Sequence, residues 1–298
     1  MSIPSRCDDD ALHRFLIEGA NARGVLVRLD ESLRAVLASG EYPTEVAQVL
    51  GQSLVAAALF GGHLKVDGRL SLQLKGSAAL RTVFAEYRDG GLLRGLAHWQ
   101  APVPVPLTPR QFGADALLAL TVESHLPGQR EPVRYQGLVG LDADSLAGAC
   151  ERYFTQSEQL PTRLILVQRD GRAAGLLLQL LPGQNHDPDA WTRVQALLDT
   201  LTEAELLELP ADTLLYRLFH EDGVQLFPRQ SLEFGCTCSR ERVAGMLRGL
   251  GEPEAMAAVQ GDVATVTCEF CGHSYAFDRI DIAGLFSEPG APSTRTPQ

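Results

Sequence analysis

The distribution of apolar and polar residues divides the first 182 positions between two periodicities. Apolar residues that recur every three or four positions predict amphipathic helices, and apolar residues at every second position predict strands. The helical pattern covers residues 11–19, 30–40, 43–62 and 144–160. The alternating pattern covers residues 23–29, 68–76, 80–90, 116–124, 133–141 and 162–170. Short strands joined by glycine-containing turns favour antiparallel pairing, so this region is predicted to be an α+β domain whose twisted, mostly antiparallel sheet carries helices on one face.

A second helical pattern follows between residues 191 and 220, after Pro182, Gly183 and Pro188 have interrupted the regular structure. Its apolar side chains recur at helical spacing, and the first five are Trp191, Val194, Leu197, Leu198 and Leu201. Helices this short are marginally stable alone and need an apolar surface on which to dock. We therefore expect a connector whose order depends on its neighbours.

These patterns predict four parts of the chain. They are an α+β core domain over 1–182, a helical connector over 183–230, a small cysteine-containing domain over 231–287 and a tail over 288–298. The tail is rich in Pro, Ser and Thr, so we expect it to be disordered. Asp144 is the expected N-cap of the helix over 144–160.

Composition and charge exclude several classes of protein. The chain has 298 residues and is 45% hydrophobic, which is enough to bury a full core, and its formal net charge is −11. An acidic protein repels phosphate, so a nucleic-acid-binding function is disfavoured. The apolar stretch 53–64 is short and contains glycines, and the first residues include acids instead of a basic and apolar leader. We expect no membrane span, no export, and a cytoplasmic protein.

Four of the six cysteines lie in two close pairs. Cys236 and Cys238 form C-x-C, and after 29 intervening residues Cys268 and Cys271 form C-x-x-C. In a reducing compartment such pairs are more typical of a metal site than of four ordinary core thiols. Four thiolates match the closed tetrahedral coordination of structural Zn²⁺. We predict that these four cysteines bind one zinc ion.

The residues around the cysteines indicate how the pairs meet and what oxidation does. Residues 240–261 predict a helix from Arg240, a glycine stop and a second short helix, and 263–277 predict two strands with a turn at Gly272. Each pair can oxidise within itself, although C-x-C closes with strain. Arg240 and Arg242 are expected to favour thiolates. Oxidation would remove the metal, which supplies much of the folding free energy of a small zinc domain.

Several segments together resemble one family. "CTCSRER" at 236–242 and "CEFCGHSYAF" at 268–277 are accompanied upstream by "YQGLVGL", "YFTQSEQLPTRL" and "LLLQLLP". This combination is similar to the redox-regulated heat-shock holdases of about 33 kilodaltons, the heat-shock protein 33 family, over residues 10–287. All four cysteine positions match.

The resemblance implies a bacterial cytoplasmic stress-response chaperone that works without ATP. It implies that the reduced, zinc-bound form is inactive, and that Cys236–Cys238 and Cys268–Cys271 disulfides form on activation. It further implies loss of order in the zinc domain and connector, binding of unfolding clients, and a homodimer as the active form. The apolar connector residues from Trp191 to Leu201 are the candidate client-binding surface.

Two other classes of function stay open at this stage. A thiol-disulfide oxidoreductase would use one exposed C-x-x-C at a helix start, whereas the second pair here lies between two expected strands. A zinc-ribbon adaptor for nucleic acid would need a basic face, which the acid excess opposes.

The remaining reactive residues carry weaker signals. His273 follows the second pair, but four cysteines already complete a tetrahedron. Cys7 and Cys150 are unpaired, and Cys150 is expected to be a packed small hydrophobe. Neither a phosphate-binding glycine loop nor a catalytic triad can be singled out, so we do not expect an enzyme.

Overall fold

A computed structural model describes residues 9–64, 68–125, 132–183 and 187–286. Cys7 and the tail over 288–298 lie outside the described residues. The chain forms two compact units, which divide between Gly235 and Cys236. Antiparallel strands dominate both units and helices accompany them, so the predicted α+β class is confirmed.

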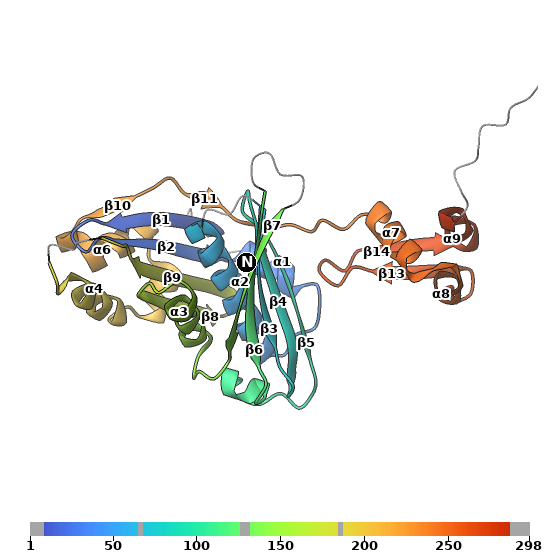
Figure 1. The fold of residues 1–298 in the computed structure, drawn as a ribbon, viewed down its shortest axis with the longest axis horizontal. Helices are drawn as coiled ribbons and strands as arrows, with labels where there is room; N and C mark the ends of the chain where they lie inside the picture. The colour runs from blue at the N-terminus through green and yellow to red at the C-terminus, as the bar shows by residue number, and fades with distance from the viewer. Residues whose placement is uncertain (1–8, 65–67, 126–131, 184–186, 287–298) are drawn as a thin grey trace, which may run out of the picture. The chain divides into compact units, whose positions relative to one another are not determined.

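The first unit contains two sheets, where the sequence pattern had suggested one (Figure 1). Sheet A has the order β10-β1-β2-β9-β8, with β11 also paired to β1, and all its pairs are antiparallel. Its strands are β1 (Ala11–Ile17), β2 (Ala22–Leu29), β8 (Thr162–Arg169), β9 (Arg172–Leu180), β10 (Val224–Leu226) and β11 (Gln230–Ser231).

Sheet B has the order β12-β5-β4-β3-β6-β7, and only the β12–β5 pair is parallel. Its strands are β3 (Gly68–Lys75), β4 (Leu80–Arg88), β5 (Leu92–Trp99), β6 (Leu117–Ser124), β7 (Val133–Gly140) and β12 (Glu233–Phe234). A short 3₁₀ helix, η1 (Pro109–Phe112), follows the proline-rich segment between β5 and β6. The segment over 224–234 thus adds strands to the edges of both sheets.

Helix α2 (Thr44–Leu64) packs against strands of both sheets and is the centre of the first unit (Figure 1). Its side chains are apolar around nearly the whole helix because the hydrophobic core surrounds it on nearly all sides. By length and hydropathy α2 would be able to cross a membrane, but 83% of its most apolar window is buried inside the protein. Two further helices, α1 (Glu31–Leu37) and α3 (Leu146–Ser157), pack against the same core.

The connector supplies three helices, α4 (Ala190–Asp199), α5 (Glu203–Glu208) and α6 (Ala211–Phe219), followed by the 3₁₀ turn η2 (His220–Asp222). They pack on the face of sheet A opposite α2. The alternation along β9 shows this, because Leu177 belongs to the core under α2 while Leu176 and Leu178 contact the connector helices. Sheet A therefore carries helices on both of its faces.

Two local predictions are wrong. Residues 11–19 form strand β1 and its turn instead of a helix, because both faces of sheet A are buried and a doubly buried strand lacks clean alternation. Ser145, not Asp144, caps α3 by accepting a hydrogen bond from the Gly148 amide. Strands β5 and β9, which the sequence analysis did not identify, contain glycine or apolar runs that blur the same alternation.

The second unit is small. It contains α7 (Arg240–Leu250), α8 (Glu252–Ala257), the hairpin β13 (Val263–Thr267) and β14 (Ser274–Asp278), and α9 (Arg279–Phe286). The predicted helix from Arg240, the glycine stop and the strand–turn–strand are confirmed, and Gly251 between the helices has φ 94°. The described buried core of this unit consists of Ala244, Leu247, Ala255, Ala264, Phe277 and Ile282.

Candidate metal centre

The four paired cysteines meet in the second unit. Their sulfur atoms all lie within 4.8 Å of one another, and each side chain is partly buried. Cys236 Sγ lies 3.6 Å from Cys268 Sγ, and Cys238 Sγ lies 3.4 Å from Cys271 Sγ. Tetrahedral zinc with Zn–S bonds of about 2.3 Å requires sulfurs about 3.8 Å apart, so the cluster has the dimensions of such a site.

The turn of the β13–β14 hairpin presents the second pair. The Cys268 amide donates to the His273 carbonyl at 2.8 Å, and the Gly272 amide donates to the Cys268 carbonyl at 2.8 Å. Gly272 has φ 70°, a left-handed conformation in which glycine is favoured. The two bonds close a tight loop and direct the Cys268 and Cys271 side chains to the same side.

The start of α7 positions the first pair. The Ser239 side chain caps the helix by accepting from the Arg242 amide at 3.3 Å. Arg242 Nη1 in turn donates to the Thr237 carbonyl and hydroxyl at 2.7 and 2.6 Å. Thr237 lies between the two cysteines, so these contacts fix the extended C-x-C segment in front of the helix.

The thiols differ in acidity. The Tyr275 hydroxyl donates to Cys238 Sγ at 3.1 Å, and this hydrogen bond lowers the pKa of Cys238 to about 7. The same bond raises the pKa of Tyr275 to about 12. Burial raises the pKa of Cys236 and raises that of Cys271 to about 12. Cys238 is therefore the thiol most readily deprotonated as a ligand or nucleophile.

The arginines act differently from the prediction. Arg240 donates to the Ala276 carbonyl at 2.6 Å and to Asp281 at 2.7 Å, and its guanidinium lies 4.1 Å from the Phe277 ring centre. It therefore ties α7 to β14 and α9, and Arg242 holds Thr237. The low pKa of Cys238 comes chiefly from Tyr275. Sequence reasoning missed this residue, although its position two residues after His273 on an alternating strand placed it near the cluster.

His273 and Cys150 take no place among the clustered sulfurs. The His273 ring packs against the Tyr275 ring at 4.6 Å between centroids, and the His273 carbonyl accepts the hydrogen bond from the Cys268 amide in the hairpin turn. Cys150 is fully buried in α3 among apolar side chains, and burial raises its pKa strongly, as expected for a packed small hydrophobe.

The candidate client-binding residues are covered in this structure. Val194 and Leu198 are completely buried against sheet A, and the other three, Trp191, Leu197 and Leu201, are partly buried in the same cluster. The Phe15 and Phe219 rings stack at 6.3 Å between β1 and α6. Arg28 of β2 donates to the Leu206 carbonyl at 2.8 Å, so a buried charged hydrogen bond also holds the connector.

The family model described as "Hsp33 protein" matches residues 10–278. The chain belongs to the Hsp33 family. A 33 kDa chaperonin of Nitrosococcus oceani is 44% identical over 290 residues, which cover 96% of this chain and 98% of that relative. A 33 kDa chaperonin of Ectopseudomonas mendocina is 43% identical over 303 residues, which cover 96% and 98%.

A solved structure agrees at the level of the fold. The crystal structure of the 33 kDa chaperonin (heat shock protein 33 homolog) of Thermotoga maritima superimposes with a TM-score of 0.76 at 22% identity, covering 93% of this chain and 97% of that one. Membership of the Hsp33 family and the names of its relatives identify this chain as a molecular chaperone. The oxidoreductase and adaptor alternatives are not favoured.

Proposed function

We propose that this chaperone is an ATP-independent holdase controlled by the oxidation of its four clustered cysteines. The observation that carries the proposal is the convergence of Cys236, Cys238, Cys268 and Cys271 within 4.8 Å, in a unit with little other core. The four thiolates would hold one Zn²⁺ in the reduced protein. When bound, that ion supplies a crosslink between the C-x-C segment, the hairpin turn and the start of α7.

Oxidation acts on the same sulfurs. In each disulfide, two thiolates lose two electrons to an oxidant such as hydrogen peroxide, which takes up two protons from solvent and is reduced to two molecules of water. We propose that the bonds form within the pairs, Cys236 with Cys238 and Cys268 with Cys271. Each bond removes two thiolate ligands, so the metal is no longer held and the second unit loses its main source of folding free energy.

Loss of order then spreads to the connector, residues 183–230, through the chain itself. Only Gly235 separates Cys236 from β12, and β12 has only two residues paired to β5. β11 also pairs over two residues and β10 over three, both with β1. Such short strands provide few hydrogen bonds. When the second unit is disordered, β10, β11 and β12 should therefore unpair before α2 loses order.

Release of the connector would expose apolar surface on the connector helices and on the face of sheet A that they cover. The connector face includes Val194, Leu198 and Phe219, and the strand face includes Phe15 and Leu176. Apolar contact is non-directional, which suits clients of unrelated sequence. We propose that this surface, with Trp191, Leu197 and Leu201, binds unfolding proteins, that the active form is a homodimer, and that the protein works in the cytoplasm without catalysing a reaction.

The test compares redox states at equal protein concentration. Reduced, zinc-loaded protein and peroxide-treated protein are mixed with a thermally unfolding client, and light scattering follows aggregation without ATP. The oxidised form should suppress aggregation and the reduced form should not. Peptide mapping should find disulfides within the pairs. Equal protection by the two forms, or bonds joining Cys236 to Cys268, would contradict the proposal.

A further inference from the structure

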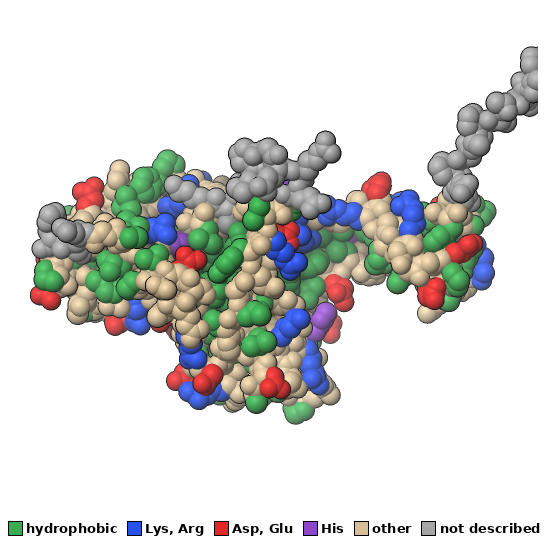
Figure 2. All heavy atoms as spheres, in the orientation of Figure 1, with side chains coloured by type: hydrophobic (Ala, Val, Ile, Leu, Met, Phe, Trp, Pro, Cys, Tyr) green, Lys and Arg blue, Asp and Glu red, His purple; other side chains and the backbone are tan. Residues whose placement is uncertain are grey.

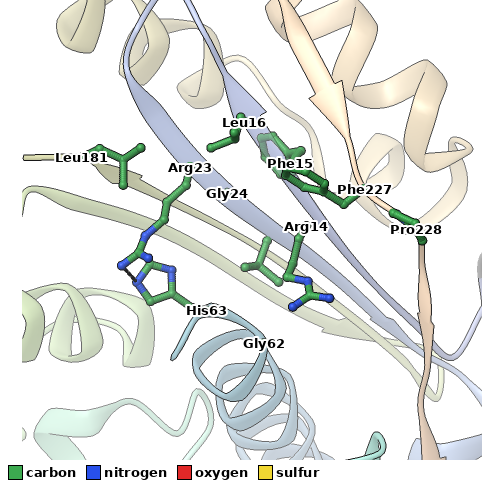
Figure 3. A pocket seen from close by; sticks show the side chains of 11 residues that line it. Arg14, Phe15, Leu16, Arg23, Gly24, Gly62, His63, Leu181, Phe227 and Pro228 are labelled. Carbon is green, nitrogen blue, oxygen red and sulfur yellow. Dashed lines mark hydrogen bonds between the residues drawn. The ribbon is translucent and has the colours of Figure 1, made fainter. Parts of the chain in front are cut away.

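A cavity of about 430 Å³ opens in the first unit where α2 ends. The pleat of the strands explains which side chains reach it. Leu12 of β1 and Val25 of β2 contact the core under α2, so Arg14 and Arg23, each two residues away along its strand, belong to the same face. Figure 3 shows both arginines extending from their strands towards the C-terminal end of α2, where His63 lies.

The rest of the lining is mainly apolar and comes from several segments. Leu16 belongs to β1, Leu181 follows β9, and Phe227 and Pro228 lie in the last residues of the connector. The Phe227 side chain is 37% exposed, and its amide donates to the Arg14 carbonyl at 2.9 Å. The cavity therefore joins the connector to the strands and to the end of α2.

The charge of this cavity is opposite to that of the protein. The chain has 37 Asp and Glu against 26 Lys and Arg, yet the described lining holds two arginines and no acid. Within the described part of the chain, the Arg14 guanidinium has no hydrogen-bonding or ion-pairing partner. Arg23 Nη2 contacts only neutral groups, Gln179 Oε1 at 2.8 Å and His63 Nε2 at 2.7 Å. Two guanidinium groups thus face the cavity without a carboxylate in contact with either, although the charge of Glu158 acts on Arg23.

His63 adds a hydrogen-bond donor. Burial, followed by the charge of Arg23, lowers the pKa of His63 to about 4, so the ring is neutral near pH 7. A guanidinium can only donate, so His63 Nε2 is the acceptor and the ring proton is on Nδ1. That buried nitrogen has no partner among the described residues. A buried donor without an acceptor is unfavourable, and an acceptor brought by a ligand would relieve it.

We propose that the cavity binds a small organic anion. Its carboxylate or phosphate oxygens would accept from Arg14, Arg23 and His63, and its apolar body would lie against Leu181 and Phe227. The volume falls within the range of about 300–1,000 Å³ that is typical of small-molecule sites, and the mixture of apolar walls with a few polar groups is also typical. A two-ring aromatic acid matches this description.

The site predicts an effect on the connector that does not depend on the metal centre. A ligand in the cavity contacts Phe227 and Pro228 on one side and β1, β2 and α2 on the other. It therefore stabilises the paired state of β10 and the residues after it. The Phe227 amide, bonded to the Arg14 carbonyl, should exchange with solvent more slowly when the ligand is present.

Calorimetric titration of the reduced, zinc-loaded full chain tests the proposal. The probes are 1-naphthaleneacetate, 1-naphthyl phosphate and the neutral 1-naphthaleneethanol. At least one anion should bind with a Kd below about 1 mM, and the neutral analogue should bind about tenfold or more weakly, because it lacks charge-assisted hydrogen bonds. The stronger of the two anions identifies whether carboxylate or phosphate is preferred.

Variants locate the site. Arg14→Gln should weaken binding of the anion about tenfold or more, and Arg23→Gln should also weaken it. Arg169→Gln, on β8 outside the cavity, is the matched control and should leave the affinity unchanged. Thermal unfolding of each variant confirms that it is folded.

Three results would overturn the proposal. They are binding by neither anion, equal affinity for the neutral analogue, and unchanged affinity in folded Arg14→Gln and Arg23→Gln proteins. Unchanged hydrogen exchange over 224–228 at saturating anion would also contradict the placement of the ligand. None of these measurements involves oxidation or a client, so their outcome is independent of the proposed redox switch.

Discussion

The two units of this chaperone are stabilised by different means. In the first unit, α2 lies between two six-stranded sheets and is buried along most of its length (Figure 1). In the described part of the second unit, six residues form the buried core and four thiols converge beside it. Chains of about 60 residues bury too little apolar surface to be more than marginally stable. The second unit therefore depends on its cysteines, whereas the first does not.

Under the proposed function, this difference would make the effect of oxidation selective. An oxidant that reaches the partly buried thiols would remove the contacts on which the second unit is proposed to depend, while the first unit buries its single described cysteine, Cys150, completely. The connector is intermediate between the two. It is well packed on sheet A, but its helices have only 10, 6 and 9 residues and its strands two or three.

The surface proposed to bind clients is largely covered in this structure. In Figure 2, hydrophobic side chains are interspersed with charged ones over the face that is drawn. Among the described residues, the largest apolar cluster outside the α2 core is the connector–sheet contact, and its members are buried or partly buried. The apolar residues proposed to bind clients are therefore covered by the packing of the connector on sheet A.

The largest expected effect is that of metal removal. Chelation, or Cys238→Ser, should abolish the order of residues 236–286, because the metal supplies roughly 10 kcal/mol or more to a small zinc domain. Residues of α2 and sheet B should stay folded. Elemental analysis should give one zinc in reduced wild-type protein and less in the variant, and NMR spectra should show which unit unfolds.

Cys150→Ala is the matched control for metal removal. Cys150 is buried in α3, so this variant should keep one zinc and a folded second unit. A zinc content well below one per chain in reduced wild-type protein would contradict the claim that zinc stabilises the second unit. Collapse of α2 on chelation would show that the two units are not independently stabilised.

Substitution of one buried phenylalanine in the connector and one in α2 tests how the connector differs from the core of the first unit. Phe219→Ala in α6 and Phe60→Ala in α2 each remove a fully buried ring, at a cost of about 3–5 kcal/mol. The first should release the connector, so that reduced protein with its zinc in place binds a hydrophobic dye and protects a client. The second should lower the unfolding midpoint of the whole first unit without such activation.

The zinc content separates these two effects. Both variants should retain one zinc when reduced, because both phenylalanines belong to the first unit and the four cysteines to the second. If reduced Phe219→Ala protein is folded and as inactive as the wild type, connector release is not what exposes the client surface.

A smaller effect concerns pH and the first unit alone. His63 has a folded pKa of about 4, below the ordinary value of 6.5, because it is buried neutral beside Arg23. The unfolded chain therefore binds a proton that the folded chain does not, and stability is full above about pH 6.5 and falls towards pH 4. The loss should reach about 3 kcal/mol, at about 1.4 kcal/mol per pKa unit. Urea unfolding of wild-type and His63→Gln proteins measures it, and an equally steep decline in the variant would refute the assignment.

The smallest expected effect is at Tyr275. Tyr275→Phe removes the hydrogen bond to Cys238 and should destabilise the second unit slightly while one zinc remains bound. Tyr216→Phe, in α6 of the first unit and 66% exposed, is the control. Thermal unfolding monitored by zinc release should shift for the first variant and not for the second; identical midpoints would show that the hydroxyl contributes nothing.

The sequence predicted the metal-centre segment better than the sheets. The C-x-C and C-x-x-C spacings, the Gly251 stop and the Gly272 turn are local signals, and each appears in the structure where it was expected. The role of Tyr275 was missed because it depends on the orientation of a side chain across the hairpin.

Sheet A was harder to foresee because its structure depends on distant segments. Residues 11–17 pair with 22–29 and, from the far end of the connector, with 224–226 and 230–231. Both faces of these strands are covered, by α2 on one side and by the connector on the other, so their apolar residues do not alternate. A helix-like pattern at 11–19 is the consequence of that double burial.

The most direct test of the account is hydrogen exchange mapped along the chain in the reduced, zinc-loaded protein and after peroxide. Amides of 236–286 and 190–226 should lose protection on oxidation, while those of α2, β3, β4 and β6 should keep theirs, and reduction with zinc should restore the original map. Equal protection of residues 190–226 in both states would contradict the central claim, because the metal centre would then not control the connector.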